Sequence, residues 1–189
     1  MRITIRPFAA HDEHALIHTI NSVCGEGRWM SSLSYEPTIA WDHALGEPGC
    51  PCHCLLVVED DKDLVGWCRI FREPPESRRA PDAGCVASKG RLGVGLRAGY
   101  RDRGIGSRVV RAALAWASWA SIEHVSLVTR SDNLRAIRVF KCAGFHLAGS
   151  DDTHIQMTCS PLPLATRQIE STPLPLRFNS QPTLENFHD

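Results

Sequence analysis

The sequence has no excess charge of either sign and no long apolar segment, and each absence excludes a class of function. Its 21 basic residues balance its 21 acidic residues, so the chain has no general attraction to nucleic acid or to an anionic membrane. It contains no run of about 18 apolar residues, the length that a membrane-spanning helix needs. The first residues, Met1 to Pro7, lack the apolar centre of a signal peptide. We therefore expect a cytoplasmic protein without nucleic-acid or membrane partners.

The eight cysteines do not show the paired spacing of a zinc site. In a reducing cytoplasm we expect mostly free thiols, with buried roles for the scattered ones, Cys24, Cys68, Cys85, Cys142 and Cys159. The segment Cys50-Pro51-Cys52-His53-Cys54 offers four soft ligands within five residues. A structural zinc site usually has two ligand pairs that are further apart, and adjacent ligands do not easily close a tetrahedron. We interpret this segment as a loop that enters a strand and expect no metal.

Apolar periodicity divides the chain into one domain and a tail. The 189 residues are 43% hydrophobic, which is enough for a single core over residues 1–159. Alternating apolar residues predict strands at 2–6, 54–59, 64–71, 91–96, 125–129, 146–148 and 154–158. Helical spacing predicts helices at 12–23, 39–45, 105–120 and 133–143. Residues 72–89 read as a loop, and the proline-rich segment 160–189 reads as a tail that is largely disordered or lies on the surface.

The segment Arg101-Asp102-Arg103-Gly104-Ile105-Gly106-Ser107 lies between a predicted strand and a predicted helix. The first N–H groups of a helix have no internal partners, and the helix dipole adds positive charge there. Glycine at this junction lets an anion approach the backbone, so the segment favours a phosphate or diphosphate site. The alternative is a tight strand–helix turn that binds nothing.

Two other phosphate-binding motifs do not fit this region. A Walker-type loop requires lysine where Ile105 stands, which excludes that motif. The letters of a dinucleotide fingerprint occur at Gly93 to Ala98, but Tyr100 to Arg103 intervene before any helix begins. We set this match aside.

The pattern Arg-x-x-Gly-x-Gly, from Arg101 to Gly106, resembles the acetyl-CoA pyrophosphate loop of the GNAT superfamily of N-acyltransferases. The segment from Asn133 to Phe145 resembles the second motif of that superfamily, with alanine three positions on, an aromatic residue seven on and Gly-Phe after eleven. We expect Ser131 or Asp132 to cap this helix and Gly144 to end it.

An apolar stripe on the second of these helices is predicted at Leu134, Ile137 and Phe140. The resemblance spans roughly residues 1–159, with its specific motifs between 91 and 145. It implies a mixed, mostly antiparallel sheet of six to seven strands flanked by helices, in the order β-α-α-β-β-β-α-β-α-β-β.

The resemblance further implies transfer of an acetyl or other short acyl group from acyl-CoA to a primary amine, by direct attack in a ternary complex. The amides from Asp102 to Ser107 would hold the diphosphate, and the strand near Val94 and Leu96 would pair with pantetheine and offer an oxyanion donor. The residues expected to bind acetyl-CoA are Val94, Leu96, Arg101, Asp102, Arg103, Gly104, Ile105, Gly106, Ser107, Asn133 and Phe140.

The chain departs from the family pattern at both groups that move protons. Many relatives carry a basic glutamate on the strand before the loop, but the segment Arg91 to Leu96 contains no acid. We take Glu26 as the candidate base, with Glu59, Glu73 and Asp82 as further acids. The tyrosine that often protonates the departing thiolate is replaced by Phe140, which has no proton to donate.

These departures leave alternatives open. The first is a GNAT-like module that binds acyl-CoA with little or no transfer. The second is an unrelated α/β nucleotide-binding protein with the same loop. The acceptor is a small-molecule or peptide amine that the sequence does not identify, and a homodimer is possible because such proteins often pair.

Overall fold

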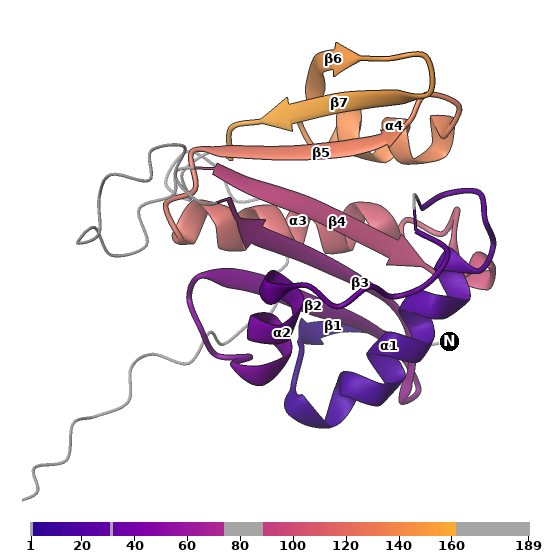
Figure 1. Ribbon diagram of the computed structural model, residues 1–189, viewed down its shortest axis with the longest axis vertical. Coiled ribbons are helices and arrows are strands. Elements are labelled where there is room, and N and C mark those ends of the chain that lie inside the picture. Colours follow the sequence, from indigo (N-terminus) through magenta and orange to yellow (C-terminus); the bar gives the residue numbers. More distant parts are fainter. Residues whose placement is uncertain (1, 31, 74–88, 162–189) are drawn as a thin grey trace, which may run out of the picture.

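A seven-stranded sheet, in the order β1-β2-β3-β4-β5-β7-β6, runs through the protein (Figure 1). The computed structural model describes residues 2–30, 32–73 and 89–161. The strands are β1 (Ile3–Pro7), β2 (His53–Asp60), β3 (Asp63–Arg72), β4 (Lys89–Leu96), β5 (His124–Arg130), β6 (His146–Ser150) and β7 (His154–Cys159). The helices are α1 (Glu13–Cys24), α2 (Ile39–Gly46), α3 (Ile105–Trp119) and α4 (Leu134–Cys142), with 3-10 turns η1 (Ala10–Asp12) and η2 (Ala98–Tyr100).

The predicted architecture is confirmed within these residues. Every neighbouring pair of strands is antiparallel except β4 and β5, which are parallel. The order of helices and strands is the expected β-α-α-β-β-β-α-β-α-β-β. The predictions for most of loop 72–89 and of tail 160–189 fall on residues outside the described ranges. No helix among the described residues combines the length and apolar character needed to cross a bilayer.

Two apolar cores cover the two faces of the sheet, because side chains alternate along a strand. From β2, Leu56 and Val58 enter the core that includes residues of α3 and α4, whereas Leu55 and Val57 enter the core that includes residues of α1 and α2. Figure 1 shows these helix pairs on opposite sides of the sheet. A strand buried on both faces reads as a continuous apolar run, as β2 does.

The sheet opens between β4 and β5. These strands are in register only from Lys89 to Arg91, opposite His124 to Ser126. Beyond that point β4 stays paired with β3 as far as Leu96, while β5 stays paired with β7. Figure 1 shows the two strands diverging from their common start. The unpaired edges of β4 and β5 therefore face each other across an opening.

Helix α4 confirms the expected end at Gly144 but corrects the expected N-cap and the expected apolar stripe. Gly144 has a φ of 99°, the left-handed conformation predicted for the residue that ends the helix. The N-cap is Asn133, whose side chain accepts from the Ala136 amide at 3.3 Å, rather than Ser131 or Asp132. The predicted stripe is wrong at Leu134, which is 70% exposed. The helix instead packs through one buried and three partly buried residues, namely Phe140, Ala136, Val139 and Ala143.

The cysteines also differ in part from expectation. Cys50 and Cys52 form a disulfide, so these two are not free thiols. Cys142 is exposed rather than buried, because it lies on the outer side of α4. The buried positions expected for Cys24, Cys68 and Cys159 are confirmed, and Cys85 is not among the described residues.

Candidate functional site

The opening between β4 and β5 contains a cavity of about 710 Å³. Its walls come from both strands, from the loop before α3, from α4 and from the connection after α1. Of the residues predicted to bind acetyl-CoA, those that line it are Val94, Leu96, Arg101, Asp102, Gly104, Gly106, Ser107, Asn133 and Phe140. Ile105 is instead buried in the core at 1% exposure, and Arg103 is not part of the lining.

The backbone of β4 presents N–H groups to this cavity. The Arg97 amide donates to the Val65 carbonyl of the neighbouring chain segment at 2.9 Å. Because hydrogen-bonded and non-hydrogen-bonded pairs alternate along antiparallel strands, the amides of Leu96 and Val94 point the other way, toward β5. The Leu96 carbonyl lies on that side too, where it accepts from Arg101 Nε at 2.8 Å. The strand thus offers the free edge that an extended ligand can pair with.

Glycines in β4 make room for large side chains of β3. Gly95 lies opposite Trp67, and a Cβ on Gly95 would overlap the Trp67 ring. Gly93 lies opposite Arg69, and a Cβ there would come within 3.1 Å of Arg69 Nε. These contacts account for the Gly-x-Gly spacing that mimics a dinucleotide fingerprint, since packing excludes a Cβ at Gly95 and leaves little room for one at Gly93.

The loop before α3 turns its backbone toward the cavity. Asp102 and Gly104 both adopt left-handed conformations, with φ of 60° and 74°. A Cβ on Gly106 would meet only ordinary contacts, 3.7 Å from Leu96 and 3.9 Å from Val139. The first turn of α3 contains no acidic residue to neutralise the helix dipole. This end of the cavity therefore suits an anion.

Two ion pairs fix the loop to its surroundings. Arg101 donates to both carboxylate oxygens of Glu26, at 2.7 and 2.6 Å. Asp102 pairs with Arg135 of α4 at 3.0 Å. Glu26 does not line the cavity, and its carboxylate is occupied by this pair. The structure therefore brings together the predicted base and a predicted phosphate ligand, in contact with each other.

The other acids named from the sequence lie away from the cavity lining. Glu59 pairs with Arg6 at 2.9 Å, and Glu73 pairs with Arg91 at 3.4 Å. Asp82 is outside the described residues.

Sequence reasoning missed the titratable pair Asp151 and His154 in the cavity wall. Hydrogen bonds from the backbone amides of Thr153 and His154 to its carboxylate lower the pKa of Asp151. The segment before β7 shows no motif that would have identified this pair.

Arg69 is a second residue that the sequence did not single out. Its guanidinium lines the cavity and lies over the rings of Phe71 and Trp41, with Cζ 4.5 and 5.2 Å from the ring centroids. No carboxylate of the described chain forms an ion pair with it. Desolvation, with a smaller contribution from the charge of Arg91, lowers the pKa of Arg69. Arginine within an apolar strand pattern gave no hint of this placement.

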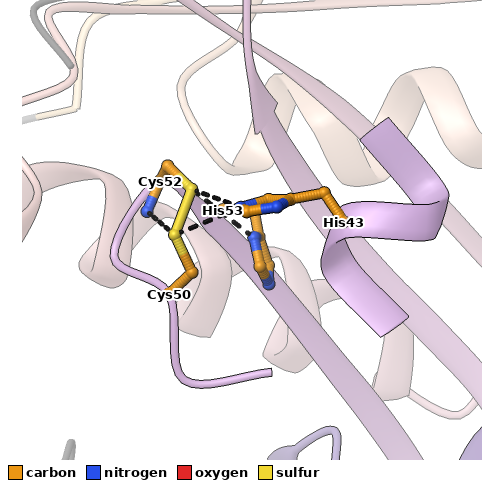
Figure 2. Close-up of side chains that lie close together, drawn as sticks. All are labelled: His43, Cys50, Cys52 and His53. Carbon is orange, nitrogen blue, oxygen red and sulfur yellow. Dashed lines mark hydrogen bonds between the residues drawn. A yellow bond between two sulfur atoms is a disulfide. The ribbon is translucent and has the colours of Figure 1, made fainter. Parts of the chain in front are cut away.

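A separate cluster lies outside the cavity, between α2 and the start of β2 (Figure 2). It contains His43, Cys50, Cys52 and His53, whose potential ligand atoms all lie within 4.8 Å of one another. His43 Nε2 is 3.0 Å from Cys52 Sγ and 3.3 Å from Cys50 Sγ. The potential ligand that the cysteine segment did not reveal is thus His43, which α2 supplies.

Comparison with known proteins assigns the same region to one family. Residues 15–145 match the model of the acetyltransferase (GNAT) family. A mycothiol acetyltransferase from Sanguibacter keddieii is 33% identical over 108 residues, which is 57% of this chain and 32% of that protein. The chain thus matches only about a third of that relative's length.

Solved structures show the same fold at low identity. A GNAT-family acetyltransferase from Streptococcus pneumoniae superposes with a TM-score of 0.71 at 18% identity, over 84% of this chain and 99% of that chain. A putative acetyltransferase from Salmonella typhimurium, solved with its cofactor acetyl-CoA, has a TM-score of 0.64 at 16% identity, over 84% of this chain and 93% of that chain.

Proposed function

Since this chain belongs to the acetyltransferase (GNAT) family, we propose that it transfers an acetyl or other short acyl group from acyl-CoA to a primary amine. Attack within a ternary complex would make the reaction effectively unimolecular, which removes much of the entropic barrier. The observation that carries the proposal is the opening between β4 and β5, with the start of α3 at one end.

The proposed binding mode follows the length of this opening. The diphosphate of CoA binds the N–H groups of the loop from Asp102 to Ser107, where the helix dipole favours negative charge. The pantetheine arm runs along β4 and pairs with the amides of Val94 and Leu96. An amide of this edge then stabilises the oxyanion that forms when the amine attacks the thioester carbon.

The amine must lose a proton, because an ordinary alkylamine with a pKa near 10.4 is charged at neutral pH. The carboxylate of Glu26 already accepts both bonds from Arg101, so we propose that Glu26 positions the loop. His154 lines the cavity, and we propose it as the group that accepts the proton, directly or through water.

The departing group is the thiolate of CoA. Phe140 lines the cavity at the position where relatives carry the proton-donating tyrosine, and it has no proton to donate. A thiol with a pKa near 8.5 leaves without full protonation, so transfer remains feasible.

A thermal-shift measurement with acetyl-CoA tests the binding part of the proposal. A ligand that binds only the folded state raises the free energy of unfolding by about 2.7 kcal/mol when its concentration is 100 times Kd. For a chain of this size that corresponds to a rise in Tm of roughly 5–10 °C. ATP and NAD at equal concentration are the matched controls. If no acyl-CoA raises Tm, the proposal is wrong.

A thiol-release screen with primary amines then tests transfer. Release of CoA that depends on an added amine supports the enzyme. Stabilisation by acetyl-CoA without release from any amine would instead support the binding module, the alternative that the missing tyrosine favours.

A further inference from the structure

The cluster between α2 and β2 combines two cysteine sulfurs and two imidazoles on one side of the sheet (Figure 2). His43 comes from α2, Cys50 and Cys52 from the following loop, and His53 is the first residue of β2. Cys54, the next thiol along the chain, is excluded because strand alternation turns it into the opposite core. The helix therefore supplies the distant ligand that a short sequence segment alone cannot offer.

The two imidazoles are suitably oriented for a cation. His43 directs Nε2 at both sulfurs, while its Nδ1 lies 3.9 Å from the Glu47 carboxylate. A carboxylate behind a histidine is the usual outer-shell arrangement of zinc ligands.

His53 is 6% exposed, and its Nδ1 is 3.9 Å from Cys52 Sγ. Its Nε2 is buried without a hydrogen-bond partner in the described chain, so the polar contact of this ring is made by Nδ1.

We propose that His43, Cys50, Cys52 and His53 form a tetrahedral site for Zn²⁺ or a similar borderline-soft ion once the disulfide is reduced. Two thiolates with two imidazoles are a ligand set typical of structural zinc. With Zn–S bonds of about 2.3 Å, tetrahedral geometry requires sulfurs roughly 3.8 Å apart, so the ion and the disulfide exclude each other.

The exchange between the two states is balanced. Two molecules of a small thiol reduce the Cys50–Cys52 bond, which yields two cysteine thiols and one small-molecule disulfide. Zn²⁺ then binds as both thiols release their protons to solvent. In the oxidised state the sulfurs are bonded to each other and cannot ligate as thiolates. The site is thus predicted to hold metal only under reducing conditions.

The role of the ion follows from its position. None of the four ligands lines the acyl-CoA cavity, and four protein ligands leave no open position for substrate. The ion would tie α2 to β2, and α2 also carries Trp41, which contacts Phe71 with ring centroids 5.2 Å apart. We therefore expect a structural site whose loading raises the stability of the whole chain.

The test uses the full chain, freed of metal with a chelator and reduced with a phosphine. Titration with Zn²⁺ against a chromophoric chelator is expected to give about one ion per chain and a higher Tm. Co²⁺ is expected to show thiolate charge-transfer and tetrahedral d–d absorption. The oxidised protein is expected to bind no ion at this site.

Variants make the result specific. Glu47→Gln is expected to weaken Zn²⁺ binding by roughly 10- to 100-fold, and Cys52→Ser by more than that. His43→Asn serves as a second ligand variant, because the His43 side chain is 39% exposed and its loss does not open the core. Cys142→Ser, at an exposed cysteine elsewhere, is the matched control and is expected to bind as the parent does. If the reduced parent binds no more Zn²⁺ than Cys52→Ser, the proposal is overturned.

Arg69 carries a second, independent inference about the acceptor, which rests on the proposed function. A guanidinium removed from water is costly unless an anion compensates it. Arg69 faces the cavity, contacts aromatic rings on one side and has no carboxylate partner in the described chain. Arg69 is in β3 and lies opposite Gly93 of β4. Gly93 precedes Val94 and the proposed phosphate loop along the chain.

We infer that the amine acceptor carries a carboxylate, as an amino acid does, and that Arg69 binds it. The planar guanidinium can bind both oxygens of such a group at once. Arg91 also lines the cavity, but its charge is paired with Glu73 at 3.4 Å, which leaves Arg69 as the arginine for the carboxylate. The CoA diphosphate would occupy the other end of the cavity, so the two anions would not compete.

The test compares α- and ω-amino acids with their carboxamides as acceptors in the thiol-release assay. We expect kcat/KM about 10- to 100-fold higher for the best acid than for its amide, and a ratio near one in Arg69→Gln. Arg91→Gln is the matched arginine control and is expected to change the ratio less, because its side chain is 58% exposed.

Failure of this inference can be told apart from failure of the proposed function. Equal use of acid and amide, a preference that survives Arg69→Gln, or no turnover with any acid overturns the carboxylate inference. If no acyl-CoA raises Tm, the proposed function is overturned instead.

Discussion

Phe140 lies where the core of α4 meets the cavity. It is 5% exposed and packs edge-on against Phe145, with ring centroids 5.8 Å apart. One part of its side chain thus belongs to the core, while another lines the cavity.

The Phe140→Tyr variant is expected to gain a proton donor for the departing thiolate. Because the thiolate already leaves fairly well, we expect kcat to rise on the order of ten-fold below pH 8.5, less than the roughly 100-fold or more that general acid catalysis usually contributes. The measurement is kcat as a function of pH, with Tm as a check on folding. Unchanged turnover and an unchanged pH profile would show that this position does not face the thiolate.

At the scale of elements, the junction of β4 and α3 contains two glycines with different physical roles. Gly104 is the N-cap of α3 and has a φ of 74°, which side chains other than glycine rarely tolerate. Gly106 lies in the first turn of α3 and lines the cavity, and a Cβ there would make only ordinary contacts with Leu96 and Val139. Folding thus requires the first glycine, and the proposed anion site requires the second.

The pair Gly104→Ala and Gly106→Ala separates these roles. Gly104→Ala is expected to lower the free energy of unfolding by about 1–2 kcal/mol through backbone strain. Gly106→Ala is expected to keep or raise it, since alanine is the better helix former by up to about 1 kcal/mol.

The same two variants are then compared for binding. Gly106→Ala is expected to raise the Kd for acetyl-CoA by roughly ten-fold or more, a loss of about 1.4 kcal/mol of binding free energy. The reason is that the alanine Cβ would occupy space that the diphosphate needs. Urea denaturation and titration calorimetry provide the two measurements. Parental affinity in Gly106→Ala would place the diphosphate elsewhere.

The connection from β1 to α1 depends on one buried carboxylate. Asp12 is 4% exposed and accepts from Arg6 at 2.6 and 2.8 Å and from the Ala9 amide at 2.9 Å. The hydrogen bonds from Arg6 hold the pKa of Asp12 below its ordinary value of 3.8. Its contribution to stability is therefore complete above about pH 3.8 and is lost as the pH falls from there through the lower folded pKa.

The Asp12→Asn variant is expected to lose about 1–3 kcal/mol of unfolding free energy at pH 7 and to show a flatter fall below pH 4. Urea denaturation from pH 7 to pH 2.5 provides the measurement. Asp132→Asn is the control, because Asp132 also pairs with an arginine but is exposed to solvent. An equal loss in both variants would contradict the role assigned to burial.

At the scale of the whole molecule, the described residues form two apolar cores. The residues of the two cores lie between Ile3 and Cys159, and the last strand pairs along its length with β5. The cavity lining ends at His154. We therefore expect that neither core depends on the segment after β7.

A chain that ends at Pro161 is expected to keep its Tm within about 2 °C and to bind acetyl-CoA as the full chain does. Thermal unfolding with and without acetyl-CoA measures both properties. Light scattering on both chains measures assembly. A large loss of Tm together with a smaller assembly would show that the tail docks on a partner subunit.

The order of elements could be predicted because it depends on short-range properties. Apolar residues that alternate give strands, and apolar residues at helical spacing give helices. The left-handed glycine at Gly144 followed from the need to end a helix. The cap at Asn133 and the exposure of Leu134 were missed, because the direction in which α4 packs decides which side is covered.

The sequence by itself determined the family, the glycine-containing loop before α3 and the order of strands and helices, because each depends on residues close together in the chain. Only the tertiary structure decided which distant residues meet. It paired Glu26 with Arg101 across 75 positions, placed Arg69 in the cavity and joined His43 to the cysteine loop. Strand register and helix docking set these contacts, and both depend on packing across the entire sheet.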